Sequence, residues 1–424
     1  MSTGLTPDLT DMTVLAELFA PLAQEPAIGL AVSGGADSLA LMLLAQRWAT
    51  TLAQPPRIVV YSVDHALRPE AAAEVAMVLE TARALGLAAT GLRWEGDKPA
   101  TGMQEAARHA RYRLIGQAMA ADGVGVLLTA HHRNDQAETV LMRLAHGSGI
   151  EGLRGMATHS IVESVRVFRP LLKLDPAALQ GVVDAAGLMP ALDPSNDDDH
   201  YERVRWRKAL PQLAALGLDA ATLGVFAERM GEADATLSAL ADAGFAELVV
   251  LDGFGAARIE LADFLNLSQA IATRVLGRVL NIVGGRQKPR ALRQVEALRQ
   301  SIAEQTLAKG TTVLGCMVRI REGAIVIARE PGRAFPPDVV LKPRQALVWD
   351  QRFLITNLSD EAGLTASVGE YLSRSRLEDF MGFKVTAPAE AIRTAPMVRD
   401  SAGGVLSLGA WSFDERITVK LLID

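Results

Sequence analysis

The stretch Ser33-Gly34-Gly35-Ala36-Asp37-Ser38 follows a short apolar run, Ile28 to Val32, and precedes a segment with helical spacing, Leu39 to Trp48. Two glycines permit positive φ and let a ligand approach the backbone closely. A helix that begins here presents unpaired N–H groups and the positive end of its dipole, which together favour an anion. The pattern predicts a phosphate-binding loop. The structural alternative is a tight strand-to-helix turn with Ser33 or Asp37 as the helix cap.

Asp37 is the unexpected member of this loop, because a carboxylate repels phosphate groups. Its presence is explained if it holds Mg²⁺, which bridges carboxylate and phosphate oxygens. The loop has no Lys before its final Ser, as the Walker type requires, and no Gly-x-Gly-x-x-Gly dinucleotide pattern. The residues therefore predict a phosphate-binding loop of a different type, with Mg²⁺ held by Asp37.

Strand and helix patterns alternate around this loop through about the first 200 residues. Apolar, β-rich runs predict strands, and Ala-rich periodic segments predict helices. This alternation is typical of the α/β class with a doubly wound parallel sheet. Ligands bind such sheets beyond the carboxyl ends of the strands, where Ser33, Asp64 and His131 all fall. The expected strands are 57–63, 87–94 and 124–129, and the expected helices are 70–85, 104–121 and 134–145.

The pattern changes after an acidic, turn-rich segment at 193–199. Residues 209–251 and 263–302 predict helices, and 311–329 predicts a β-hairpin that turns at Glu322-Gly323. Prolines 331, 336 and 337 indicate a linker, followed by about 90 residues of short strands and turns. We therefore expect an ATP-binding domain at 1–208, a helical domain ending in a hairpin at 209–332, and a small α+β domain at 333–424.

Composition limits the classes of protein that the chain can represent. Its 424 residues have a formal net charge of -6, so a nucleic-acid partner would need a local basic face. Cys316 is the single cysteine, which excludes a disulfide, a cysteine-ligated zinc site and an iron–sulfur cluster within the chain and favours a small buried apolar role for its side chain. The first 20 residues lack a signal-peptide pattern and no apolar run is long enough to span a membrane. We expect a cytoplasmic protein.

The loop resembles that of the N-type ATP pyrophosphatases, which cleave ATP between the α- and β-phosphates and adenylate a carbonyl-type oxygen. Other segments resemble the tRNA(Ile)-lysidine synthetases within that superfamily. The resemblance is specific over about residues 27–210 and looser to about 335. The matching segments are Val63-Asp64-His65-Ala66-Leu67-Arg68, 105–112, Thr129-Ala130-His131-His132, 135–139, 147–153, 169–172 and 193–196.

This resemblance implies a reaction on a tRNA base. Cytidine 34 in the CAU anticodon of tRNA(Ile) would be adenylated at its C2 oxygen, and the ε-amine of L-lysine would displace AMP to give lysidine. The implied cofactors are ATP and Mg²⁺, and the implied partners are tRNA(Ile) and L-lysine. No membrane partner is expected, and self-association as a homodimer is left open.

The resemblance and the residue chemistry together give a set of candidate site residues. Asp135 and Glu138 lie about one helical turn apart, so both carboxylates fall on one helix face. Such a pair suits Mg²⁺, the lysine ammonium or proton removal from that amine. A lysine amine is protonated near pH 7, so a nearby base is required, and whether Asp135 or Glu138 binds or deprotonates the amine stays open. An exposed acidic helix face is the alternative. The predicted catalytic residues are Asp37, Asp135, Glu138, Arg111 and His131; the predicted ATP-binding residues are 33–38, Asp64 and His65; and the predicted Mg²⁺ ligands are Asp37 and Asp135.

Two basic clusters are candidates for tRNA binding, each with a solvated helix surface as its alternative. Two positions depart from the family pattern. Asn134 stands where an aspartate is usual, and Val204 stands where an asparagine is usual, so each loses a polar function. The clusters are Arg203, Arg205 and Arg207, and Arg286, Lys288 and Arg290.

Two other functions are consistent with part of this pattern. A tRNA thiolase of the same superfamily commonly relies on paired cysteines, and this chain has only Cys316. A nucleotide- or tRNA-binding module without catalysis would not need Asp37 and Asp135. Both alternatives are therefore weaker than lysidine formation.

Overall fold

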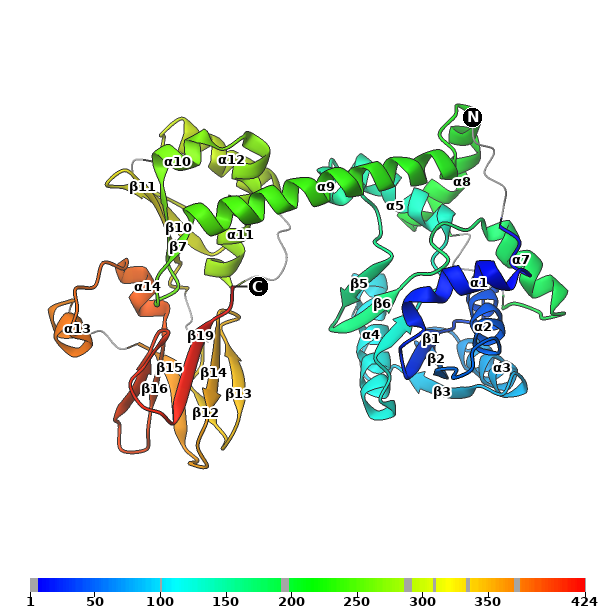
Figure 1. Cartoon of the computed structure of the whole chain (residues 1–424), viewed down its shortest axis with the longest axis horizontal. Coiled ribbons are helices and arrows are strands. Elements are labelled where there is room, and N and C mark those ends of the chain that lie inside the picture. The colour runs from blue at the N-terminus through cyan, green and yellow to red at the C-terminus, as the bar shows by residue number, and fades with distance from the viewer. Residues whose placement is uncertain are drawn as a thin grey trace. The chain divides into compact units, whose positions relative to one another are not determined.

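The computed structural model describes residues 7–99, 101–191, 198–285, 292–307, 310–332, 336–369 and 374–423. Its contacts divide the chain into two compact units, Met1–Asp234 and Ala235–Asp424, which are treated separately here (Figure 1). The expected division into three domains stays a prediction.

Unit 1 is built on a six-stranded sheet with the order β3-β2-β1-β4-β6-β5. Five strands are parallel, which confirms the predicted doubly wound α/β fold. The edge strand β5 is antiparallel to β6, a hairpin that the sequence analysis did not predict. The strands are β1 (Ala27–Ala31), β2 (Arg57–Asp64), β3 (Ala88–Arg93), β4 (Val126–Leu128), β5 (His159–Val162) and β6 (Val165–Phe168).

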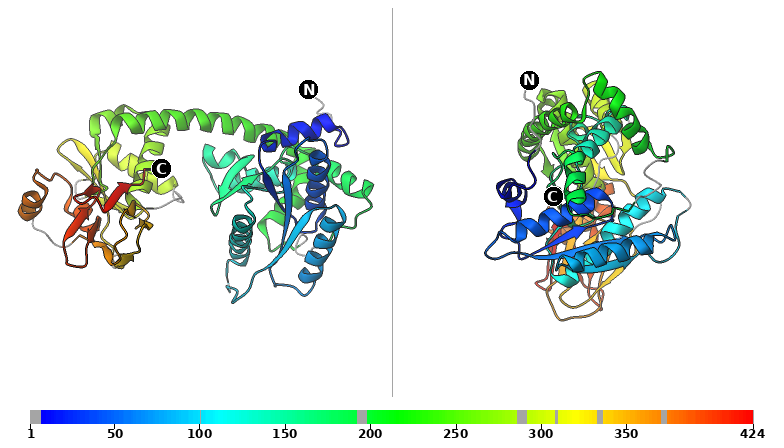
Figure 2. Two further views of the ribbon diagram at one scale, coloured as in Figure 1. Left: turned by 60° about the horizontal axis from the view of Figure 1, so that its bottom comes forward. Right: turned by 90° about the vertical axis from the view of Figure 1, so that its right-hand side faces the viewer.

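Helices cover both faces of this sheet (Figure 2). Alternate residues of a strand point to opposite faces, and on β2 Val60 joins the core under α2, α3 and α7, whereas Tyr61 joins the core under α4. The order of the strands reverses at β1, since β2 and β4 lie on either side of it, and this is where open α/β sheets bind ligands. The helices are α1 (Met12–Phe19), α2 (Ala36–Ala49), α3 (Ala71–Ala84), α4 (Met103–Asp122), α5 (Arg133–Ala145), α6 (Ile150–Leu153) and α7 (Pro176–Ala185), with the 3₁₀ turn η1 (Ala20–Leu22).

The predicted helix at 209–251 is two helices, α8 (Glu202–Ala215) and α9 (Ala220–Leu248). Gly217 has a φ of +90° and ends the first, while the Asp219 carboxylate accepts a hydrogen bond from the Thr222 N–H and starts the second. The region with alternating arginines at 203–207 is therefore helical. Apolar residues of α5, α8 and α9 form one small core.

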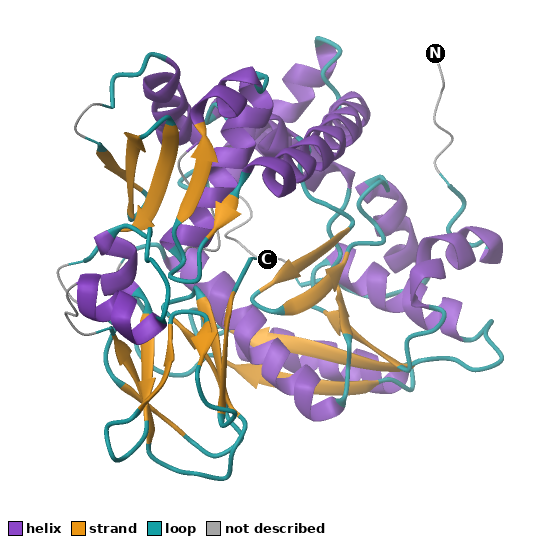
Figure 3. Cartoon of the chain, turned by 60° about the vertical axis from the view of Figure 1, so that its left-hand side comes forward, coloured by secondary structure: helices purple, strands orange, loops and turns teal. Residues whose placement is uncertain are grey.

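Unit 2 contains three antiparallel sheets, drawn in orange in Figure 3. The first has the order β7-β8-β11-β10-β9 and packs on α11 and α12. The hairpin predicted at 311–329 is present, with Arg321 opposite Ala324 across the turn. The elements are β7 (Val250–Leu251), β8 (Ala257–Glu260), α10 (Leu261–Asn266), α11 (Gln269–Gly284), α12 (Leu292–Ala303), β9 (Thr311–Val313), β10 (Cys316–Arg321) and β11 (Ala324–Arg329).

The last part of unit 2 combines a five-stranded sheet, β12-β15-β16-β17-β18, with a three-stranded sheet, β13-β14-β19. Side chains from both sheets share one core. The elements are β12 (Val339–Leu341), β13 (Ala346–Trp349), β14 (Phe353–Asn357), β15 (Leu364–Val368), α13 (Arg374–Met381), α14 (Ala389–Thr394), β16 (Pro396–Arg399), β17 (Val405–Leu408), β18 (Trp411–Ser412) and β19 (Ile417–Leu421).

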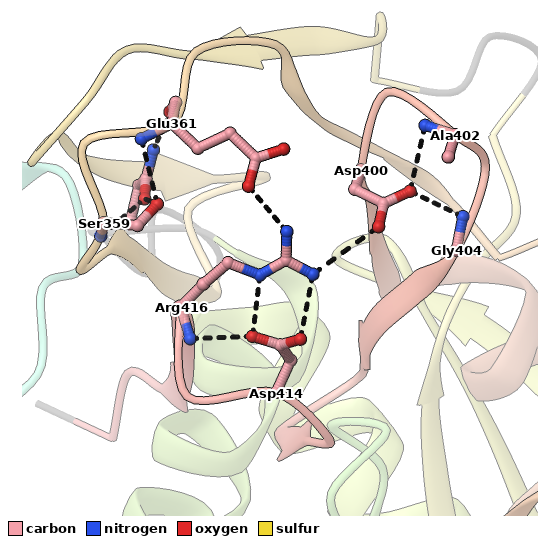
Figure 4. A network of polar contacts seen from close by, with 8 residues as sticks. Ser359, Glu361, Asp400, Ala402, Gly404, Asp414 and Arg416 are labelled. Atoms are coloured by element: carbon pink, nitrogen blue, oxygen red, sulfur yellow. Dashed lines mark hydrogen bonds and ion pairs between the residues drawn. The ribbon is translucent and has the colours of Figure 1, made fainter.

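Arg416 connects three loops of this last part (Figure 4). Its Nε and Nη2 each donate to Asp414 at 2.9 Å, and its Nη1 donates to Glu361 at 2.5 Å. Nη2 also reaches Asp400 at 3.5 Å. All three guanidinium nitrogens therefore have carboxylate partners.

No single helix in the described ranges is long and apolar enough to cross a membrane. The pair α8 and α9 satisfies the length and composition requirement only when joined, and a bend of 100° separates the two helices.

Candidate active site

The loop at 33–38 is folded around its two serines. Ser38 Oγ donates to the Gly35 carbonyl at 2.9 Å and accepts from the Ser33 N–H at 3.2 Å. Gly34 has a φ of +93°, a conformation that the absence of Cβ makes accessible. Helix α2 begins at Ala36 with Gly35 as its N-cap, and no side chain caps it. Its first N–H groups are thus available to an anion, as a phosphate loop requires.

His132 joins this loop to helix α5. Its Nδ1 accepts hydrogen bonds from the N–H groups of Asn134 and Asp135, which places the proton on Nε2. That Nε2 lies 3.5 Å from an Asp37 carboxylate oxygen and 3.4 Å from an Asp135 oxygen. Burial acts to lower the pKa of His132, but the hydrogen bond to Asp37 and the charges of the nearby carboxylates outweigh burial and raise it. The two predicted metal ligands are therefore brought together around one imidazole.

Glu138 is fully buried and pairs with two arginines of α8. Arg207 Nε donates to Glu138 Oε1 at 2.8 Å, and Arg203 Nε lies 3.0 Å from Oε2 in an ion pair. Arg207 also approaches Asp135, with Nη2 and Oδ1 4.0 Å apart. Both carboxylates face α8, as expected from their spacing. Glu138 is already neutralised by these contacts, whereas Asp135 remains beside Asp37.

The other side of the site is cationic. His131 lies near Arg111, Arg169 and Arg203, and its Nδ1 is 2.9 Å from Thr129 Oγ1. Burial lowers the pKa of His131 to about 3, and the three guanidinium groups act in the same direction as burial. Neutral His131 therefore lies between these three guanidinium groups and the Asp135 carboxylate, whose charge acts in the opposite direction on its pKa. Such a group of cations suits the developing charge on an α-phosphate.

Several polar atoms on this side are buried without a hydrogen-bond partner among the described residues. They include His65 Nδ1 and Arg169 Nε. Arg169 is only 4% exposed and uses Nη1 to bind the Ala157 carbonyl and Ser160 Oγ. Native proteins rarely leave such groups unpaired, so each points to a ligand or water.

Asp64 and His65 lie at the end of β2, next to the loop on β1. Asp64 is 7% exposed, and its Oδ1 accepts from the Ala66 N–H at 2.7 Å. Burial and the charge of Arg111 lower the pKa of His65. The structure thus collects the predicted residues at the carboxyl ends of β1, β2 and β4.

The predicted tRNA-binding residues divide into three groups. Arg203 and Arg207 face the site, on the side of α8 that contacts Glu138. Arg205 binds the carbonyl groups of Asp199 and His200 instead. Arg286, Lys288 and Arg290 lie outside the described residues, as does the segment 193–196.

Two features of the site were not predicted from the sequence. One is the bridging position of His132, and the other is the role of Arg169, which the sequence pattern does not indicate. Arg169 directly follows the apolar strand β6, and a charged residue at the carboxyl end of a buried strand is the signal that could have identified it. Val204, where the family has an amide, is buried in α8.

The donor set is compatible with Mg²⁺. The described residues contain no group of three or more His, Cys, Asp or Glu that would enclose a metal ion. Mg²⁺ commonly uses one or two carboxylates and completes its shell with phosphate oxygens and water. Asp37 and Asp135, which share His132 as a neighbour beside the phosphate loop, are the carboxylates that would hold it.

Comparison with known proteins agrees with this geometry. Residues 7–214 match the family model described as a PP-loop domain. The chain is 43% identical over 341 residues to the tRNA(Ile)-lysidine synthase of Rhodopseudomonas palustris, covering 78% of this chain and 98% of that protein. It is 41% identical over 355 residues to the same enzyme of Bradyrhizobium sp. BTAi1, covering 78% and 99%.

Among solved structures, the U34-tRNA thiolase NcsA from Methanococcus maripaludis aligns with 52% of this chain and 78% of its own, at 13% identity and a TM-score of 0.45. That likeness is too low to bear on function. The sequence relatives are decisive, because they align over nearly their whole length. The chain belongs to the tRNA(Ile)-lysidine synthase family.

Proposed function

We propose that this protein uses ATP to join L-lysine to C2 of cytidine 34 in the CAU anticodon of tRNA(Ile). The tRNA is first adenylated at the C2 oxygen with release of pyrophosphate. The lysine ε-amine then attacks C2, and AMP leaves. The observation that carries the proposal is the uncapped phosphate loop beside Asp37 and Asp135, in a chain of this family.

Each side of the site has a separate task in this reaction. The loop at 33–38 holds the phosphates with backbone N–H groups, and Asp64 and His65 bind the rest of ATP. Arg111, with Arg169 and Arg203 nearby, stabilises negative charge on the α-phosphate as the C2 oxygen attacks it. His131 stays neutral and can hydrogen-bond the base without adding charge.

Asp135 is the residue that we assign to the lysine amine. The amine must lose a proton before it attacks, and Asp135 is a carboxylate that Glu138's arginines do not neutralise completely. Glu138 instead positions Arg203 and Arg207. Mg²⁺ held by Asp37 and Asp135 would offset the negative charge of the phosphates.

The test is to incubate the full chain with ATP, Mg²⁺, radiolabelled lysine and tRNA(Ile) transcripts. AMP, pyrophosphate and labelled tRNA should form in equal amounts with the CAU anticodon and not with a GAU anticodon. If lysine never enters the tRNA, the proposal is wrong. A thiolase would instead require a sulfur donor, and Cys316, the single cysteine, is buried within unit 2.

A further inference from the structure

A second concave surface lies in unit 1, along the side of α4 that carries His109 and Arg113. It is a groove of about 620 Å³ between α4 and the turn that joins β5 to β6. Residues two apart on a helix point in nearly opposite directions. The charge of Arg111 lowers the pKa of His65 and of His131, so the Arg111 side chain faces the catalytic crevice. His109 and Arg113 lie two positions before and after it and line the groove, so they face away from that crevice.

The groove is built by close packing of small residues. Ala106, Ala110 and Ala120 line it from α4. A Cβ on Gly116 would lie 2.9 Å from a Val165 methyl, so glycine at this position permits α4 to approach β6. The volume falls within the range of sites that hold small planar ligands.

The turn at one wall of the groove is held in an unfavourable conformation. Glu163 and Ser164 both have positive φ, 48° and 67°. A two-residue hairpin of this kind normally uses Asn-Gly, because other residues cost about 1 to 2 kcal/mol each in this region. Such strain persists only where surrounding contacts enforce it, and it is common at binding sites.

The contact that the strained turn makes is with His109. His109 Nδ1 lies 2.7 Å from one oxygen of Glu163, and its Nε2 lies 3.7 Å from Glu105. The second oxygen of Glu163 has no partner within the described residues. The turn thus fixes a carboxylate oxygen at the groove wall, ready to accept a hydrogen bond.

The polar groups of the groove favour a base over a phosphate. Glu105 and Glu163 would repel a phosphate at this wall, whereas a carboxylate accepts well from an exocyclic amine. Arg113 and Gln117 line the groove and make no hydrogen bond or ion pair to any described residue. A guanidinium and an amide can stack on a base and pair with its edge.

We propose that this groove binds an unpaired base of the tRNA that lies near the target cytidine and carries an exocyclic amine. The inference rests on the proposed function. A helix is about 10 Å across, so a single strand with one base in the catalytic crevice can place a neighbouring base on the other side of α4. Loop nucleotides with splayed bases are the usual targets of sequence-specific RNA recognition.

The test compares two variants of the turn. Glu163→Asn removes the carboxylate but keeps a residue that tolerates positive φ, and Ser164→Gly relaxes the turn and keeps the carboxylate. The first should raise KM for tRNA(Ile) about 10-fold with kcat and KM for ATP unchanged, the effect of losing a hydrogen bond to a charged group. The second should change KM for tRNA less than about 2-fold. Ala106→Leu, which narrows the groove from α4, should reproduce the first result.

A second measurement identifies the base. Full-length tRNA(Ile) is made abasic at each loop position beside cytidine 34 in turn. With the wild-type protein, one position should raise KM about 10-fold, and Glu163→Asn should show no further loss at that position. The proposal is overturned if Glu163→Asn and Ala106→Leu keep the wild-type KM for tRNA. It is also overturned if, at every abasic position, the increase in KM multiplies in full with the increase caused by Glu163→Asn. If the wild type forms no lysidine at all, the proposed function fails instead.

Discussion

The arginines of the two units differ in how completely their donors are used. In unit 2, Arg416 gives all three nitrogens to Asp414, Glu361 and Asp400 (Figure 4). In unit 1, Arg169 is 4% exposed, and its Nε has no hydrogen-bond partner among the described residues. A satisfied network on the surface holds loops together. Unsatisfied buried donors destabilise the protein unless a ligand completes them, so they indicate function.

The largest expected effect comes from Asp37. Asp37→Ala removes the carboxylate next to the phosphate loop and one of the two proposed metal ligands. We expect pyrophosphate release to fall at least about 10³-fold, the scale of removing a preorganised electrostatic group, with the melting temperature nearly unchanged because the Asp37 side chain is 41% exposed. Asp400→Ala in unit 2 is the matched control and should keep full activity. Equal losses in the two variants would remove the distinction between the two regions.

Glu138 and Glu361 form a matched pair, since each gives a carboxylate to an arginine. Glu138→Gln leaves Arg203 and Arg207 without a full counter-charge at a buried position. It should lower the free energy of unfolding by about 2 kcal/mol. This loss is smaller than that from breaking a fully buried ion pair, because both arginines are partly exposed. It should also lower kcat about 10²-fold. Urea unfolding and lysine incorporation provide the two measurements.

Glu361→Gln should leave kcat unchanged and shift the urea midpoint less than Glu138→Gln does. If Glu138→Gln kept full kcat, Glu138 would be a purely structural residue, and the role that we give to its arginines would fail.

Arg207→Lys tests whether geometry or charge matters in unit 1. The Arg207 guanidinium contacts Glu138 through Nε and approaches Asp135 through Nη2. An ammonium is a single point charge and cannot span both carboxylates. We expect kcat to fall about 10-fold with little change in stability. Retention of full kcat would show that charge alone is sufficient.

The smallest effect concerns Asp414, in the satisfied network of unit 2. Hydrogen bonds from the Arg416 side chain and backbone lower the pKa of Asp414 to about 2. A lowered folded pKa means that the contribution to stability is present above the unfolded value of about 4 and is lost as pH falls from about 4 toward 2. Asp414→Asn should therefore flatten this acid limb in urea unfolding curves and leave lysidine formation at pH 7 unchanged. An unaltered acid limb would contradict the prediction.

The core of unit 1 was predictable because its signals are local. Apolar runs ending in glycine or serine located β1, and Ala-rich periodic segments located α2 through α5 within a few residues. The β5–β6 hairpin was missed because its strands are four residues long and its turn is Glu163-Ser164 in place of a glycine turn. The helix expected from residue 209 begins earlier, at Glu202, because apolar residues of α8 pack on α5.

The sequence indicated most of the residues that meet at the candidate site, but not which of these residues form ion pairs with one another. The loop and the strand ends named Asp37, Asp64 and His131 without knowledge of the structure. The contacts of Glu138 join residues 65 and 69 positions apart in the chain, and no local pattern encodes which arginine a carboxylate selects. Their spacing places Asp135 and Glu138 on one helix face. Only the packing of α8 against that face determines that Glu138 is neutralised by two arginines while Asp135 lies beside the phosphate loop.

The serine contacts inside the 33–38 turn affect the order in which the substrates bind. Because Ser38 already ties the turn to Ser33 and Gly35, little chain entropy is lost when phosphates arrive. Nucleotide capture then needs no prior docking of RNA. We expect ATP and tRNA to bind in random order, with the same dissociation constant for ATP whether or not the tRNA is present.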